Sequence, residues 1–158
     1  MKHIFSRVLA VGLLIVAYFT AFLFLVVTQL SHSTADAFPE LAYMRIPVLV
    51  LVYVMLAAIL LAIIISTTIL FRNNMETIFS WKVVKSLWHI AHLFAIALIS
   101  NLLIILYGFS QVGLDLGMPG FILYGVFSVI LVATMVLYFI ASLFKKAVRF
   151  KEENEMTV

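Results

Sequence analysis

The stretch IPVLVLVYVMLAAILLAIIISTTILF, residues 46–71, decides the fold class of this chain. It contains no charged side chain and is bounded by Arg45 and Arg72. A helix that crosses the hydrocarbon core of a bilayer needs about 20 apolar residues. Pro47 falls in the first turn, where its missing N–H costs no helical hydrogen bond. The stretch therefore predicts a transmembrane helix.

Three further apolar runs of similar length lie at residues 8–30, about 87–109 and 121–144, the last one opened by Pro119 and Gly120. Overall, 66% of the residues are hydrophobic and 11% are charged, whereas soluble domains carry about 25% charged residues. We predict an all-α membrane protein, a four-transmembrane-helix bundle that forms one domain over residues 1–158, with a short cytoplasmic tail at 145–158.

The first run resembles a secretory signal, because Lys2 and Arg7 precede it and residues 35–37 resemble a cleavage site. The apolar part of a signal peptide is, however, only about 7–15 residues long. We therefore expect an uncleaved first helix.

Basic residues set the expected orientation. Nine of the ten Lys and Arg residues flank one side of the predicted spans, at the N-terminus, in the middle loop and in the tail, and Arg45 alone belongs to the other side. The asymmetry predicts that both termini and the middle loop are cytoplasmic.

Composition and motifs exclude several function classes. The chain has no Cys, which removes disulfides, thiolate metal sites and Cys nucleophiles. The basic residues form no stripe with interleaved aromatics, so no direct nucleic-acid contact is expected. No hydrolase or phosphate-binding motif is present, and no predicted span carries an ionisable Asp, Glu, Lys or Arg. We expect a non-enzymatic protein without a cofactor, in contact with membrane lipids; the sequence leaves its oligomeric state open.

Polar side chains nevertheless gather on the third and fourth spans. Because polar groups in hydrocarbon are costly without partners, we expect them to face inward, between these two helices. The predicted inward face consists of His89, His92, Ser100, Asn101, Tyr107, Tyr124, Ser128 and Tyr138.

His89 and His92 allow a sharper interpretation. Their i, i+3 spacing suits two imidazoles on one metal ion or a proton relay. Two ligands do not make a metal site, however, and His3 and His32 lie far along the chain. We expect no bound metal and hydrogen bonds from both imidazoles to neighbouring helices or headgroups. For Asn101 we expect an interhelical hydrogen bond.

Small residues recur in the second span at Ala58, Ala62 and Ser66, a spacing that permits close helix packing. Trp81 and Trp88 lie at the cytoplasmic start of the third span and are typical of an interfacial aromatic belt. Residues 77–86 allow a separate amphipathic helix at the interface.

Three short stretches are similar to a known family: FPELAY at residues 38–43 followed by Pro47 and Tyr53, Phe79-Ser80 in the middle loop, and ENEMTV at residues 153–158. With these features the chain resembles the bacterial membrane proteins of domain of unknown function 2975. The resemblance covers nearly the whole chain and implies a four-helix membrane protein of unknown biochemistry.

Such proteins are often encoded beside a very small helix-turn-helix protein. The resemblance thus implies a membrane partner or sensor for a transcriptional regulator, acting through protein–protein contact. By charge alone the tail is a solvated end without structure, but its family-like pattern makes Glu153, Asn154, Glu155, Met156, Thr157 and Val158 candidates for docking a partner. The alternative functions are handling of a lipid or small molecule, and immunity or tolerance to a membrane-active peptide.

Overall fold

The computed structural model describes residues 2–72, 77–113 and 117–156, and every regular element in them is helical. The elements are α1 (Lys2–Ala37), the short 3-10 helix η1 (Pro39–Met44), α2 (Arg45–Arg72), α3 (Trp81–Val112) and α4 (Gly117–Met156). All four α-helices contain a segment long and apolar enough to cross a membrane. The prediction of four spans is confirmed at this level.

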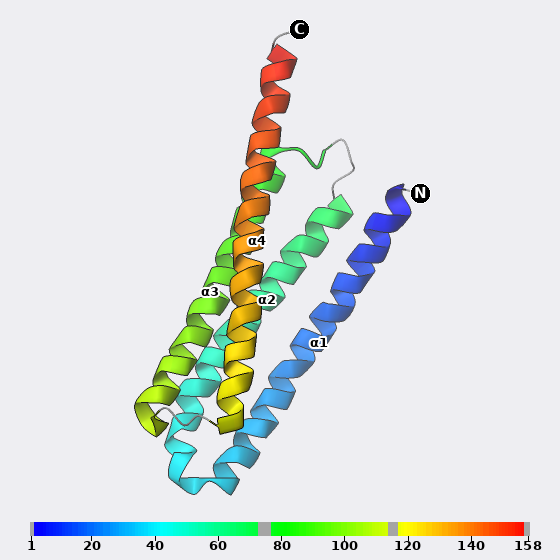
Figure 1. Ribbon diagram of the computed structural model, residues 1–158. Coiled ribbons are helices and arrows are strands. Elements are labelled where there is room, and N and C mark those ends of the chain that lie inside the picture. Colours follow the sequence, from blue (N-terminus) through cyan, green and yellow to red (C-terminus); the bar gives the residue numbers. More distant parts are fainter. Residues whose placement is uncertain (1, 73–76, 114–116, 157–158) are drawn as a thin grey trace.

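The helices run antiparallel to their sequence neighbours, as Figure 1 shows. Both ends of the chain therefore lie at the same end of the molecule as the α2–α3 connection. We call this the terminal end, and we call the opposite end, where η1 lies, the η1 end.

The helices are longer than the predicted spans, and the connections between them are correspondingly short. Residues 31–37, expected in a loop, continue α1, and most of the remainder of that loop forms η1. The prediction that residues 77–86 could form a separate interfacial helix was wrong. Trp81 already begins α3, and only residues 77–80 lie before the helix starts. The aromatic and basic residues of this segment, such as Trp81 and Lys82, are therefore part of the first turns of α3.

Glycine ends α3 and begins α4. Gly113 has φ 78° and its N–H donates to the carbonyl oxygen of Phe109 at 3.0 Å, while Gly117 has φ 54°. Side chains disfavour this left-handed region, so glycine stops a helix here at little steric cost. These two positions fix where the chain turns back at the η1 end.

Each helix packs against its neighbours in the sequence: α1 on α2, α2 on α3, and α3 on α4. In the described residues, the backbones of α1 and α4 do not come close to each other. A buried cluster of Ala58, Ala97 and Ile130 joins α2, α3 and α4. Ala58 and Ala62 are nearly inaccessible, and as small side chains they permit the close approach of α2 and α3.

Hydroxyl groups inside the helices bond to their own backbone. In α2, the side chains of Ser66, Thr67 and Thr68 each donate at 2.8 Å to the carbonyl oxygen four residues earlier. This pairing satisfies the hydroxyl proton within the helix. Polar residues in the middle of an apolar helix therefore need no partner from a second helix.

Candidate functional site

The polar residues predicted to face inward occupy different environments. In α3, Ser100 and Asn101 are buried, Tyr107 is half-buried, and His89 and His92 are exposed on the protein surface. In α4, Tyr138 is half-buried, whereas Tyr124 and Ser128 are exposed. The structure thus divides this set between the α3–α4 contact and the outer surface.

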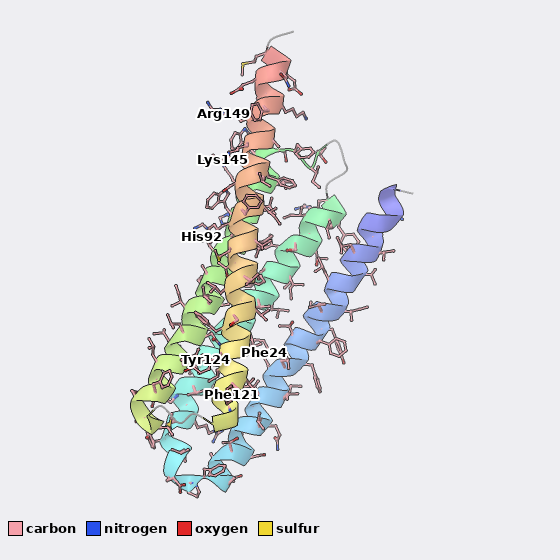
Figure 2. All side chains as sticks on the ribbon, viewed as in Figure 1. Phe24, His92, Phe121, Tyr124, Lys145 and Arg149 are labelled. Carbon is pink, nitrogen blue, oxygen red and sulfur yellow. The ribbon has the colours of Figure 1, made fainter. Side chains whose placement is uncertain are left out.

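One group from this set meets at the contact of α3 and α4. The ring of Tyr138 lies 5.5 Å from that of Trp88 and 5.7 Å from that of His92, both in edge-to-face arrangements. Nδ1 of His92 donates to the carbonyl oxygen of Trp88 at 2.6 Å. This bond leaves Nε2 as the acceptor of a neutral His92. Figure 2 places His92 along α3, on the side of the bundle next to α4.

Toward the η1 end, the ring of Tyr124 lies 6.2 Å from that of Phe109 of α3. Ser128, one turn further along α4, donates to the carbonyl oxygen of Tyr124 at 2.9 Å. Aromatic contacts rather than polar ones therefore join α3 to α4 at both of these levels. They hold α4 against its neighbour without defining a reactive centre.

The two histidines have no third metal-ligating residue beside them. Among the described residues, no group of three His, Asp or Glu side chains is close enough to hold a metal ion. His92 makes the ring contacts described above, whereas His89 has none of them and is exposed. We assign no catalytic or metal-binding role to this pair.

Asn101 is the largest fully buried side chain of the described residues. Its Nδ2 donates to the thioether sulfur of Met55 in α2 at 3.8 Å, and its Oδ1 has no hydrogen-bond partner among those residues. A thioether is a weak acceptor. The contact is interhelical, as expected, but much of the hydrogen-bonding capacity of this amide is unused.

The connections at the η1 end were not foreseen from the sequence. Arg45 bonds to Ser31 at 3.2 Å and contacts His32, so the start of α2 is fastened to the end of α1. Tyr43 of η1 donates to Gln111 of α3 at 3.0 Å. The sequence feature that could have indicated these contacts is the position of Tyr43 and Arg45 between two apolar runs.

A second fastening joins α1 and α2 within their apolar parts. Thr28 and Tyr53 share a short hydroxyl–hydroxyl hydrogen bond, and the ring of Tyr53 lies 5.4 Å from that of Phe24, which Figure 2 labels. Thr28 and Tyr53 are half-buried. A polar pair in two otherwise apolar spans gives this interface a specific register.

At the terminal end, α4 continues beyond its apolar part as one helix. We call residues 145–156 the α4 extension. Its Glu152 accepts a 2.6 Å hydrogen bond from Nε1 of Trp81 in α3. Just before the extension, Phe144 stacks on Phe79 with ring centroids 5.4 Å apart. Figure 2 labels Lys145 and Arg149 on this part of α4.

The tail therefore differs from the solvated, unstructured end expected from its charge. Residues up to Met156 are helical, and two ion pairs span one helical turn each, Arg149–Glu153 at 3.1 Å and Lys151–Glu155 at 3.9 Å. Pairs at this spacing support a helix that has no tertiary packing. Of the docking candidates, Glu153 to Met156 are exposed, whereas Thr157 and Val158 lie outside the described residues.

Four long apolar helices define the class of this protein: an all-α, multi-pass membrane protein. A family model described as protein of unknown function (DUF2975) matches residues 29–158, and the chain belongs to this family. The resemblance noted from the FPELAY and ENEMTV stretches is thereby confirmed. No curated protein and no solved structure matches the chain.

Proposed function

We propose that this protein acts through contact with a cytoplasmic protein, and that the exposed tip of the α4 extension is the contact surface. The observation that carries the proposal is a charged helix that continues past the apolar part of α4 and remains ordered up to Met156. Contacts through Phe144 and Glu152 fasten its base to the rest of the molecule. A helix of this kind holds its tip at a fixed place, and Glu153 to Met156 at that tip are exposed.

The chemistry of the tip suits a protein partner. Glu153, Asn154 and Glu155 supply acceptors and one amide, and the side chain of Met156 is 81% exposed. Exposed methionine adapts well to varied apolar surfaces. We propose a small helix-turn-helix regulator as the partner, held at the membrane or released from it, and a non-enzymatic role for the membrane protein itself.

This function requires that the terminal end faces the cytoplasm, and the distribution of basic residues supports that orientation. Lys145, Lys146, Arg149 and Lys151 lie on the α4 extension, and Lys82 and Lys85 lie at the start of α3. Basic residues beside spans are enriched on the cytoplasmic side. The proposed location is therefore the cytoplasmic membrane of a bacterial cell, with both termini inside.

A pull-down in mild detergent tests the contact. The full-length protein and a variant that lacks residues 153–158 are purified from the native cell, and bound proteins are identified by mass spectrometry. We expect one small soluble protein with the full-length chain and its loss on truncation. The double variant Glu153→Gln/Glu155→Gln keeps the chain length, so it separates loss of charge from loss of the tip. Equal recovery with all three chains would refute the proposed contact surface.

A second candidate function is the handling of a lipid or small molecule. The observation that favours it is a cavity between α2 and α3 near the terminal end. Recovery of a bound lipid with no protein partner would move this candidate ahead of the first.

A further inference from the structure

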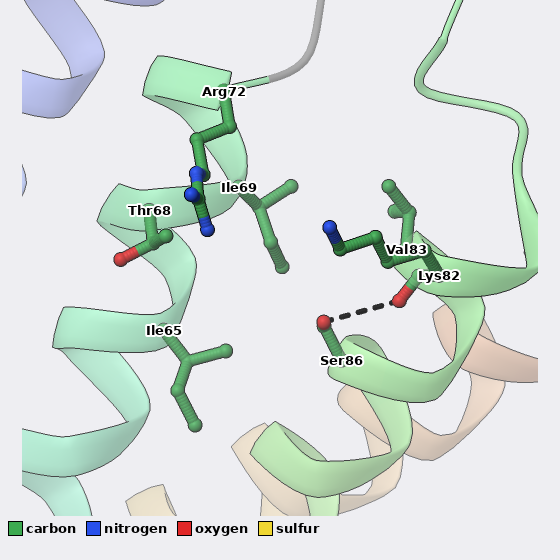
Figure 3. Close-up of a pocket in the computed structure, with 7 residues that line it drawn as sticks. All are labelled: Ile65, Thr68, Ile69, Arg72, Lys82, Val83 and Ser86. Carbon is green, nitrogen blue, oxygen red and sulfur yellow. Dashed lines mark hydrogen bonds between the residues drawn. The ribbon is translucent and has the colours of Figure 1, made fainter.

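A cavity of about 350 Å³ opens between the last turns of α2 and the first turns of α3. Its volume lies within the range of about 300–1,000 Å³ that is typical of ligand sites. Figure 3 shows the lining side chains, which come from two helices that run in opposite directions. The lining residues are Ile65, Thr68, Ile69, Arg72, Lys82, Val83 and Ser86.

Two basic side chains line this cavity, one from each helix. Lys82 in α3 extends toward α2, whereas Arg72 runs back along the last turns of α2, as Figure 3 shows. Among the residues that the structure describes, neither takes part in an ion pair and no Asp or Glu lines the cavity. Two basic side chains that line one cavity favour an anionic ligand in it.

The hydroxyl groups in the cavity are already occupied as donors. Ser86 donates to the carbonyl oxygen of Lys82 at 3.1 Å, and Thr68 donates to that of Ile64 at 2.8 Å. The donors that remain for a ligand are the guanidinium and ammonium groups of Arg72 and Lys82. The site therefore offers charge-assisted hydrogen bonds, which suit a phosphate oxygen better than a neutral group.

The rest of the cavity lining is mainly apolar. Ile65 and Ile69 of α2 and Val83 of α3 supply it, and Ile65 lies about two turns further into the apolar span than Arg72. A ligand that fits this gradient has an anionic head and an apolar body. Trp81 and Lys82 open α3 at the level where a membrane helix meets the lipid headgroups.

We propose that this cavity binds the phosphate headgroup of an anionic membrane lipid. Arg72 and Lys82 hold the phosphate, and the first carbons of the lipid lie against Ile65 and Ile69. Basic pockets between transmembrane helices suit this class of ligand. The inference rests on the cavity and not on the α4 extension, so it stands independently of the proposed protein contact.

The test uses full-length protein in neutral detergent, with phosphatidylglycerol as the anionic probe and phosphatidylcholine as the zwitterionic control. Native mass spectrometry counts lipid adducts as lipid is titrated. We expect saturable binding of phosphatidylglycerol, weakened about fivefold or more by Lys82→Gln or Arg72→Gln, the factor that one basic residue near an anionic surface contributes. Lys82→Arg keeps the charge and should retain binding.

Lys85→Gln is the matched control. Lys85 lies on the same helix as Lys82, less than one turn away, is exposed, and does not line the cavity. Its substitution removes the same charge and should change lipid binding by less than about twofold. Equal losses with Lys82→Gln and Lys85→Gln would overturn the proposal, because they would reduce it to general surface charge.

Two further competition experiments show whether the bound phosphate belongs to a lipid or to a soluble compound. Inorganic phosphate and glycerol phosphate share the charged group but lack the apolar body. We expect neither to displace phosphatidylglycerol at millimolar concentration. Displacement by either would make the site one for a soluble phosphate and would contradict the lipid assignment, as would equal binding of phosphatidylcholine.

Discussion

Asn101 shows how a single residue departs from the sequence expectation. It is buried and contacts α2, but its amide reaches only the sulfur of Met55 and its Oδ1 lacks a partner among the described residues. An unsatisfied buried acceptor costs about 1–3 kcal/mol, whereas an apolar replacement of similar shape is nearly neutral.

We therefore predict that Asn101→Leu leaves the free energy of unfolding within about 1 kcal/mol of the original protein or raises it. SDS titration of the purified protein, followed by circular dichroism, measures this change. Asn101→Asp is the contrasting variant and should destabilise strongly, since it places a carboxyl group in the same apolar site. A loss above about 2 kcal/mol for Asn101→Leu would mean that Oδ1 has a partner in the folded protein.

At the scale of single residues, the sequence showed which polar residues lie in the spans but not which of them are buried. The sequence analysis placed both Ser100 and His89 on the inward face, but Ser100 is buried and His89 is exposed. The reason is that α4 contacts α3 over a limited part of its surface, and period alone does not say where a neighbour lies. Contacts such as Thr28–Tyr53 depend on a pairing between helices that no local pattern encodes.

At the scale of elements, the apolar runs predicted where helices cross the membrane but not where they end. Hydrophobicity stops near residue 144, yet α4 continues to Met156. The continuation depends on pairs one turn apart, such as Arg149 with Glu153, together with the contact of Glu152 with Trp81. Such pairs favour helix formation without any apolar face.

Removal of residues 153–158 should leave the melting temperature in detergent nearly unchanged, because Glu152 and its bond to Trp81 remain in the truncated chain. Exposed ion pairs contribute only about 0.2–1 kcal/mol. Fluorescence-detected thermal unfolding measures this directly. Glu152→Gln in the full-length chain is the control and should lower the melting temperature by more than the truncation does. The reverse order would show that the tip, rather than the base of the α4 extension, secures α4.

At the scale of the whole molecule, the four spans and the placement of both chain ends at one end follow from an even number of antiparallel helices. Which helices pack against one another could not be predicted, since all four runs are similarly apolar. α1 packs on α2 and η1 alone among the described elements. Its large apolar side chains, such as Tyr18 and Leu25, are about 70% exposed, which suits lipid as their surroundings.

Reporter fusions test the orientation of the four helices in the membrane. Nine basic residues against one predict that fusions after Lys85 and after Val158 both report the cytoplasm. A fusion after Glu40, in η1, should report the outside and serves as the internal control. An external signal at either of the first two positions would overturn the proposed topology and, with it, the cytoplasmic location of the α4 extension.

Photocrosslinking in intact cells tests the proposed contact of the α4 extension most directly. A photoreactive residue replaces Asn154 at the exposed tip, and in a matched strain it replaces Phe139, which is 63% exposed within the apolar part of α4. We predict that the probe at position 154 forms an adduct of defined mass with one small soluble protein and that the probe at position 139 forms none. No adduct from position 154, or the same protein adduct from both positions, would contradict the proposal.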